Sequence, residues 1–205
     1  MKPFSIILQN LAVLAVFVLA LVGYGLWRSD ARLVDRDLPV HYPEAPARGA
    51  LGEVVESAGV TVTVLSAERR RSSEGTGGLV LSSRAKIDDL TDFVTVTVAV
   101  SNGSDEPVSL DYYGTGQRAD VLLGARKPAP RAALPLLPND VRRMGAAEPL
   151  PARVLEPGES VSGSLVYPVN RQASELALAI LPARSLTATG HTLPSFEIDL
   201  EPPSR

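Results

Sequence analysis

The feature that most constrains this chain of 205 residues is a strict alternation in residues 93–102, FVTVTVAVSN. Its valines recur at every second position, so a β-strand places all of them on one face: Val94, Val96, Val98 and Val100. A helix would scatter them around its axis, because helical side chains repeat every 3.6 residues. The segment therefore predicts a half-buried β-strand whose valines face a core.

The same pattern of alternation occurs in six further segments, which are separated by turn residues. Asn102-Gly103-Ser104-Asp105 and Glu156-Pro157-Gly158-Glu159 are typical turn sequences. The further strands are expected at residues 59–67, 108–112, 119–123, 160–169, 176–180 and 196–201. This arrangement predicts an all-β fold, an antiparallel β-sandwich of immunoglobulin type over residues 59–201. The chain contains no cysteine, which excludes the intersheet disulfide of antibody domains.

The N-terminal segment predicts a membrane anchor. Residues 11–27, LAVLAVFVLALVGYGLW, carry no charge. As a helix they would extend about 25 Å, and a count from Phe4 gives about 36 Å, enough to cross a bilayer core. We therefore predict a single transmembrane helix within residues 1–27. The alternative is a cleaved signal peptide, which an apolar run of this length and the lack of a clear Ala-x-Ala site disfavour.

The sequence also predicts the orientation of the anchor and the nature of the two segments that flank the sandwich. Arginines after the span outnumber Lys2 before it, which alone would keep the C-terminal part inside the cell. Long domains are translocated largely regardless of charge, however, and a start this close to the span resembles a signal-anchor. We expect a single-pass protein of the cell (inner) membrane with its domain on the periplasmic or extracellular side. Residues 28–58, with three prolines, are expected to form an extended stalk, and residues 202–205 a tail.

One face of the predicted anchor carries small side chains and an amide. Its residues follow spacings of three and four, which place them on one stripe of a helix: Gln9, Ala12, Val16, Ala20 and Gly23. Small residues let helices approach closely in lipid, and glutamine can hydrogen-bond across the contact. The stripe is therefore a candidate docking face for another membrane helix, although alanine and glycine are common in membrane helices in general.

Residues 125–151 form a second candidate docking element. This segment contains six prolines among 27 residues, so it cannot form a central strand throughout. Leu134, Leu136 and Leu137 make it too apolar for a plain linker. A connection this long is unusual in a compact domain. We expect it either to wrap the sandwich or to lie on a neighbouring protein.

The strand and turn motifs also support a resemblance to a known family. Residues 93–110, FVTVTVAVSNGSDEPVSL, and 154–169, VLEPGESVSGSLVYPV, resemble the telokin-like immunoglobulin domains of bacterial anchored or secreted proteins. This family is similar to a mycobacterial immunoprotective extracellular antigen. The resemblance covers about residues 52–200, and it implies an extracytoplasmic sandwich without catalytic residues. The tracts 69–92 and 125–151 depart from the family pattern by their length.

Catalytic and metal-binding motifs are missing from the sequence. The chain has no cysteine and only two distant histidines, His41 and His191, which excludes a transition-metal site of the usual kinds. Asp88, Asp89 and Asp92 form the tightest acidic cluster, which we interpret as a solvated loop rather than a calcium site. We therefore expect no cofactor, no metal and no enzymatic activity.

Two polar motifs have a structural and a functional interpretation. Asn102-Gly103-Ser104 matches the glycosylation sequon, and we interpret it as a turn. Arg69-Arg70-Arg71 is consistent with an anionic partner or, more simply, with exposed charges at a hairpin end. A net charge of −3 and an aromatic content of 5% argue against a nucleic-acid partner.

Together these features predict a non-catalytic, membrane-anchored binding or scaffolding module outside the cytoplasm. Its most concrete form is an accessory subunit that stabilises a larger membrane protein complex. The alternative is an independent envelope protein that binds a soluble ligand or partner through the sandwich loops. A hydrolase or metal-handling enzyme is the third, least favoured hypothesis. We expect no small-molecule substrate.

Overall fold

The computed structural model describes residues 40, 42, 44–71, 91–110, 121–128, 130–145, 148–181 and 191–201. The predicted anchor within residues 1–27, including the stripe from Gln9 to Gly23, lies outside these residues, as does the tail 202–205. All described residues belong to one compact unit, which spans residues 35–205. In this described part, no helix has the length and apolarity needed to cross a membrane.

The described residues form twelve β-strands and one short helix, which are arranged in three sheets. The four-stranded sheet has the order β2 (Val54–Ser57), β3 (Val60–Arg71), β4 (Thr91–Asn102) and β9 (Ser160–Asn170). The five-stranded sheet has the order β1 (Ala47–Ala50), β12 (Phe196–Asp199), β10 (Ser174–Ile180), β6 (Val121–Lys127) and β7 (Arg131–Ala133). The small sheet has the order β11 (His191–Thr192), β5 (Val108–Leu110) and β8 (Arg153–Leu155). The helix α2 spans Pro138–Arg143.

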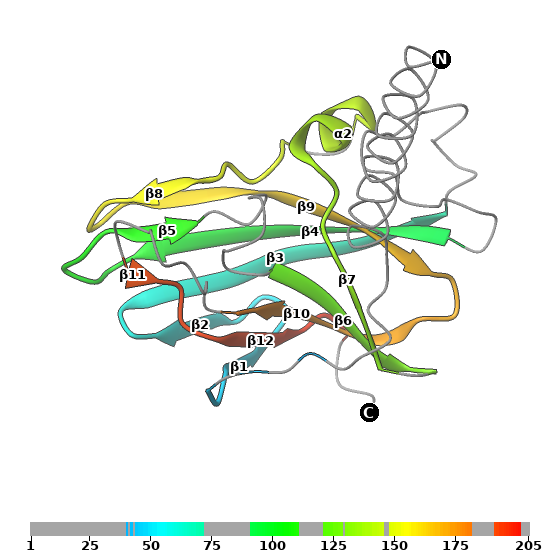
Figure 1. The fold of residues 1–205 in the computed structure, drawn as a ribbon, viewed down its shortest axis with the longest axis horizontal. Helices are drawn as coiled ribbons and strands as arrows, with labels where there is room; N and C mark the ends of the chain where they lie inside the picture. The colour runs from blue at the N-terminus through cyan, green and yellow to red at the C-terminus, as the bar shows by residue number, and fades with distance from the viewer. Residues whose placement is uncertain are drawn as a thin grey trace, which may run out of the picture. The chain divides into compact units, whose positions relative to one another are not determined.

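The two larger sheets pack face to face as the layers of a β-sandwich, with the small sheet at one end (Figure 1). Neighbouring strands are antiparallel, apart from the parallel pairs β1–β12 and β11–β5. The prediction of a mainly antiparallel all-β sandwich is therefore confirmed. Each of the seven predicted strands overlaps an observed strand.

The core lies between the layers and follows the predicted alternation. Val94, Val96, Val98 and Val100 of β4 are all buried and belong to the main core cluster. β4 pairs with β3 on one side and with β9 on the other, so it is a central strand. The opposite layer contributes alternate residues such as Leu178 of β10. The valine alternation therefore marks a strand that has one face in the main core and is paired along both edges.

The sandwich begins earlier in the chain than predicted. β1 and β2 lie inside residues 28–58, which we expected to form a stalk. A two-residue turn joins β2 to β3, and both of its residues, Ala58 (φ 48°) and Gly59 (φ 76°), have positive φ as in a type I′ turn. The pairing of β2 with β3 thus fixes β2 as a strand, although four residues are too few to show a clear alternation.

The long proline-rich connection covers the outer edge of β9. The Leu136 N–H donates to the Val166 carbonyl (2.7 Å) and the Leu150 N–H to the Ser164 carbonyl (3.0 Å), while the Ser164 N–H donates to the Glu148 carbonyl (2.8 Å). Residues 134–145 and 148–150 are called the edge segment below. Unpaired backbone groups at a sheet edge invite association with other chains, and here the chain supplies their partners itself.

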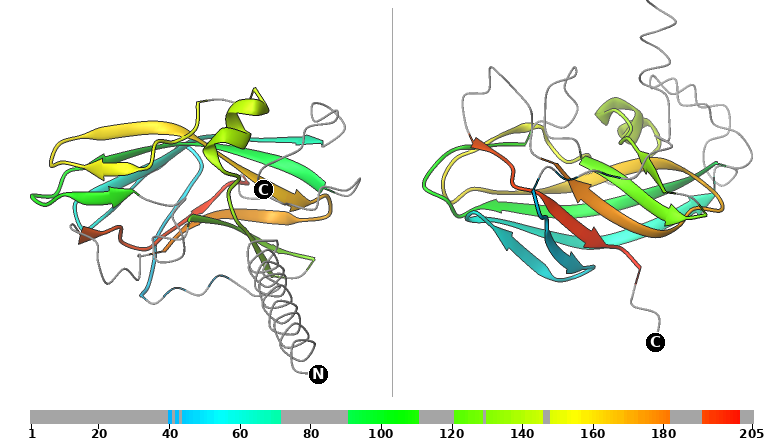
Figure 2. Two further views of the ribbon diagram at one scale, coloured as in Figure 1. Left: turned by 45° about the horizontal axis from the view of Figure 1, so that its top comes forward. Right: turned by 60° about the horizontal axis from the view of Figure 1, so that its bottom comes forward.

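Apolar contacts hold the edge segment in place. Phe93 of β4 and Val166 of β9 form a buried cluster with Leu136 and Val141, against which Met144 packs. The helix α2 accordingly lies beside β9 (Figures 1 and 2). Of the two expectations for residues 125–151, the structure therefore places the described part of this segment on the sandwich of its own chain.

The fit of the edge segment against β9 gives the first prediction. A Cβ atom added at Gly163 would overlap the backbone of Pro149 and Leu150. We expect Gly163→Ala to destabilise the protein by about 1–3 kcal/mol, because the edge segment must move away from β9. Urea unfolding of the purified protein measures the change.

Ser162→Ala is the matched control for this prediction, because Ser162 is an exposed residue of the same strand. It should change the free energy of unfolding by less than about 0.5 kcal/mol. Equal stability of the Gly163→Ala variant and the wild type would contradict the tight contact between the edge segment and β9.

Candidate functional site

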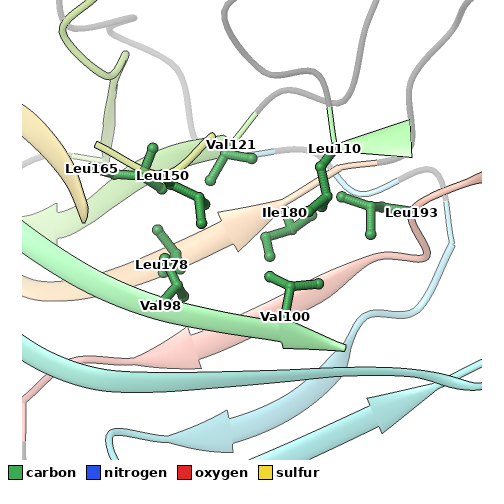
Figure 3. A pocket seen from close by; sticks show the side chains of 9 residues that line it. All are labelled: Val98, Val100, Leu110, Val121, Leu150, Leu165, Leu178, Ile180 and Leu193. Atoms are coloured by element: carbon green, nitrogen blue, oxygen red, sulfur yellow. The ribbon is translucent and has the colours of Figure 1, made fainter. Parts of the chain in front are cut away.

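One small cavity between the layers is lined by described residues and is too small to be a ligand site. This cavity measures about 10 Å³, and it is lined only by apolar side chains (Figure 3). That volume is close to the minimum for one water molecule, whereas small-molecule pockets are typically about 300–1,000 Å³. The lining residues are Val98, Val100, Leu110, Val121, Leu150, Leu165, Leu178, Ile180 and Leu193. The cavity is therefore a small packing gap of the core.

The acidic cluster of the sequence has a structural role at its one described member. Asp88 and Asp89 lie outside the described residues, whereas Asp92 is a buried residue of β4. Its carboxylate accepts hydrogen bonds from Nε of Arg69 (3.0 Å) and Nε of Arg171 (3.2 Å). The expectation of a solvated loop is therefore wrong for Asp92, because two guanidinium groups compensate its buried charge. Among the described residues, no group of three or more His, Asp or Glu side chains could hold a metal ion.

Arg69 links β3 to the turn between β9 and β10. Its guanidinium donates to the carbonyls of Ala173 (2.7 Å), Asn170 (3.0 Å) and Arg171 (2.8 Å). Together with Asp92 it forms a clamp on that turn. In contrast, Arg70 pairs with Glu68 (3.3 Å), and both side chains are largely exposed. The arginine run thus combines one structural residue with exposed charge.

Asn102 is a structural residue of the corner after β4. Its Nδ2 donates to the carbonyls of Glu106 (2.8 Å) and Leu155 (2.9 Å), and its Oδ1 accepts from the N–H (3.0 Å) and the hydroxyl (2.6 Å) of Ser104. The side chain is buried, and these bonds occupy its amide. The interpretation of this motif as a turn is confirmed.

The leucines of the edge segment have three different environments. Leu136 is only 1% exposed and is part of the chain's own core. Leu134 is partly buried and packs against Leu122, Ala132 and Ala179. Leu137 remains 38% exposed. Of the three candidate docking residues in this segment, Leu137 thus keeps the most exposed side chain, while the burial of Leu136 holds the segment on β9.

Residues that precede β1 cover part of the outer face of the five-stranded sheet. Val40 and Tyr42 pack against the cluster of Leu122, Ala132 and Ala179. Burial and the neighbouring Glu197 carboxylate raise the pKa of the Tyr42 phenol above its ordinary value. The chain therefore enters the sandwich along this face.

An ion-pair network lies close to Tyr42 on the same sheet. Arg126 contacts Glu197 (2.6 Å) and Asp199 (3.1 Å), and Arg48 contacts Glu197 (3.2 Å). The hydrogen bond from Arg126 to Glu197 raises the pKa of that guanidinium further. These opposite charges compensate one another. We therefore interpret the network as stabilising the residues that lead into the sandwich, rather than as a binding site.

Three exposed large apolar side chains lie in or next to β2 and β3, on the side of the four-stranded sheet that is remote from β9. Val54 is 70% exposed, Leu65 is 54% exposed and Leu51 is 37% exposed. The Gly52 N–H donates to the Val64 carbonyl (2.9 Å), which places the turn between β1 and β2 beside β3. Leu65 occupies an irregularity of β3 between Val64 and Ser66. We call Leu51, Val54 and Leu65 the β2 patch.

The backbone beside the β2 patch is also open. β2 ends the order of its sheet, and within the described ranges no strand pairs with its outer edge. The type I′ turn makes Ser57–Val60 and Val55–Val62 the hydrogen-bonded pairs. The N–H and C=O groups of Val54 and Glu56 therefore point away from β3. The β2 patch and this free edge together form the candidate interaction site.

Sequence reasoning missed this site for a clear reason. Leu51, Val54 and Glu56 lie in the predicted stalk, where no partner strand was expected. Leu65 carries the one available signal, because it places a large apolar side chain at a position where the alternation of Val60, Val62 and Val64 calls for a polar one.

Comparison with known proteins shows similarity of fold. No protein family model and no curated protein matches the chain. YjhA from Bacillus subtilis aligns with a TM-score of 0.53 and 16% identity, over 75% of this chain and 99% of YjhA. YcdA from the same organism aligns with a TM-score of 0.45 and 18% identity over 76% of this chain, which spans 39% of the YcdA chain.

A third structure is an uncharacterised β-sandwich protein from Clostridium difficile 630. It aligns with a TM-score of 0.32 and 9% identity, over 80% of this chain and 100% of that protein. At these levels of identity the comparisons concern the fold alone. The described residues have the fold of a β-sandwich.

The Asp92 clamp gives the second prediction. Asp92→Asn removes the negative charge between Arg69 and Arg171, and we expect it to destabilise the protein by about 1–3 kcal/mol. The control Glu68→Gln removes an exposed ion pair and should cost well under about 1 kcal/mol. Urea unfolding at neutral pH measures both. Equal effects of the two variants would contradict a structural role for Asp92.

Proposed function

We propose that this chain is a membrane-anchored extracytoplasmic protein whose immunoglobulin-like sandwich binds another protein without catalysing a reaction. In the most specific form of the proposal, it is an accessory subunit that stabilises a larger membrane complex. The observation that carries the proposal is the β2 patch beside a free strand edge, where Val54 is 70% exposed. Exposed apolar groups next to unpaired backbone groups are typical of surfaces that another chain covers.

The contrast between the two borders of the four-stranded sheet supports this proposal. The chain covers the outer edge of β9 with its own edge segment. It leaves β2 without such a cover among the described residues and adds apolar side chains there. A protein that acted alone would be expected to protect both borders, because an open apolar edge promotes aggregation.

The sequence of the N-terminal segment supports the membrane part of the proposal. Its apolar run is long enough to cross a bilayer, and the stripe from Gln9 to Gly23 suits contact with another membrane helix. A helix contact and a sandwich contact with the same complex would strengthen each other, because the second contact forms within an already bound assembly.

The third prediction concerns isolation of the full chain from its native membrane in mild detergent. The chain should elute together with a partner in a fixed stoichiometry. Ala20→Leu should reduce this copurification several-fold, because a larger side chain on the stripe separates the helices. Val18→Leu is the matched control, since residue 18 lies on the opposite side of a helix, and it should have little effect.

The result that would contradict the proposal is elution of the full chain as a single species without a partner. That result would favour the alternative of an independent envelope protein. Equal loss of the partner in Ala20→Leu and Val18→Leu would contradict the role of the stripe.

A further inference from the structure

We infer that the outer edge of β2 binds an extended segment of the partner by strand addition, and that this segment carries an apolar and a basic residue two positions apart. This inference rests on the proposed function, because it assumes that the sandwich binds another protein. It adds the site, the binding mode and the chemistry of the partner.

The backbone of β2 is the first argument. The outward-pointing residues Val54 and Glu56 each present one N–H donor and one C=O acceptor along the free edge. An extended peptide that pairs with these groups would become the fifth strand of the sheet. Strand addition of this kind obtains affinity from main-chain hydrogen bonds and specificity from alternate side chains.

The side chains on the outer face are the second argument. Val54 and Glu56 are two positions apart, so both side chains lie on the face of the sheet that points away from the core. Across the strand pair, Val54 faces Thr63, which lies two residues from the exposed Leu65. A docked strand would place one side chain beside Val54, which lies between that strand and β3, and the second-next side chain beside Glu56.

The charge of the edge is the third argument. Glu56 and Glu53 are both exposed residues of this border, and the Glu53 carboxylate accepts the Ala50 N–H (2.8 Å). Opposite charges on neighbouring strands stabilise their pairing, while like charges oppose it. The edge therefore favours a basic side chain beside Glu56. A second copy of this chain would bring two further glutamates to the same contact, so a different protein is the favoured occupant.

The test uses a defined probe and the full chain in lipid nanodiscs. The probe is a peptide with blocked ends. Its threonines alternate with three other residues, which are valine, lysine and valine in that order. A second peptide carries glutamate in place of the lysine. NMR titration should show shifts at the amides of Val54 and Glu56. The lysine peptide should bind about three- to tenfold more tightly than the glutamate peptide. A lysine peptide with methylated backbone nitrogens should not bind, because it cannot pair with the edge.

Matched variants locate the site. Glu56→Lys should reverse the preference between the two peptides. Val54→Lys should weaken binding of the lysine peptide at least several-fold, since it replaces the apolar contact by a like charge. Val154→Lys is the control, because Val154 is an exposed valine of β8 in the small sheet, and it should leave binding unchanged. Unchanged NMR spectra away from the substituted residue verify that each variant is folded.

Several outcomes would overturn the inference. These are equal binding of the two peptides, an unchanged preference in Glu56→Lys, equal effects of Val54→Lys and Val154→Lys, or shifts confined to other strands. Concentration-dependent shifts of Val54 without any peptide would identify a second copy as the occupant and would also overturn it. If the peptide experiments fail while a partner still copurifies with the full chain, only this inference is wrong. If no partner copurifies, the proposed function itself is wrong.

Discussion

Backbone N–H and C=O groups at the border of a β-sheet need partners, and this constraint organises the described part of the molecule. The central strand β4 meets it by pairing with β3 and β9 along its length. β9 meets it through the edge segment, which is fixed by the burial of Leu136 and Val141. Within the part of the chain that the structure describes, β2 has an open border with outward-pointing backbone groups, exposed apolar side chains and acidic charge. The proposed binding site thus lies at this open border of β2.

Much of the sandwich could be predicted because its longer strands have one face in the core. In β4, the valines at alternate positions from 94 to 100 are buried, and the period of two is visible in the sequence. β9 shows this period less clearly, because residues 163–167 are all buried and Val166 packs under the edge segment. Turn residues mark the ends of these strands, as the hydrogen bonds of Asn102 illustrate. The sequence pattern therefore reports burial directly, and burial determines which segments become strands.

The remaining elements could not be predicted because distant contacts create them. β1 has only four residues, and its parallel pairing with β12 at the far end of the chain gives it its conformation. The edge segment contains prolines, which argue against a strand. It runs along β9 and is joined to it by individual hydrogen bonds. The candidate site shares this origin, because Val54 and Leu65 become neighbours only when β2 pairs with β3. Asp92 was misinterpreted for the same reason, since its partner Arg171 is distant in sequence.

Amide hydrogen exchange of the isolated full chain tests most directly whether one border is covered by the chain itself and the other is left for a partner. The account predicts slow exchange at Leu136, Leu150 and Ser164, whose N–H groups are bonded along the β9 border. It predicts fast exchange at Val54 and Glu56, whose N–H groups point outward from β2. Slow exchange at Val54 and Glu56, or exchange at Leu136 and Leu150 as fast as in an unfolded peptide, would contradict it.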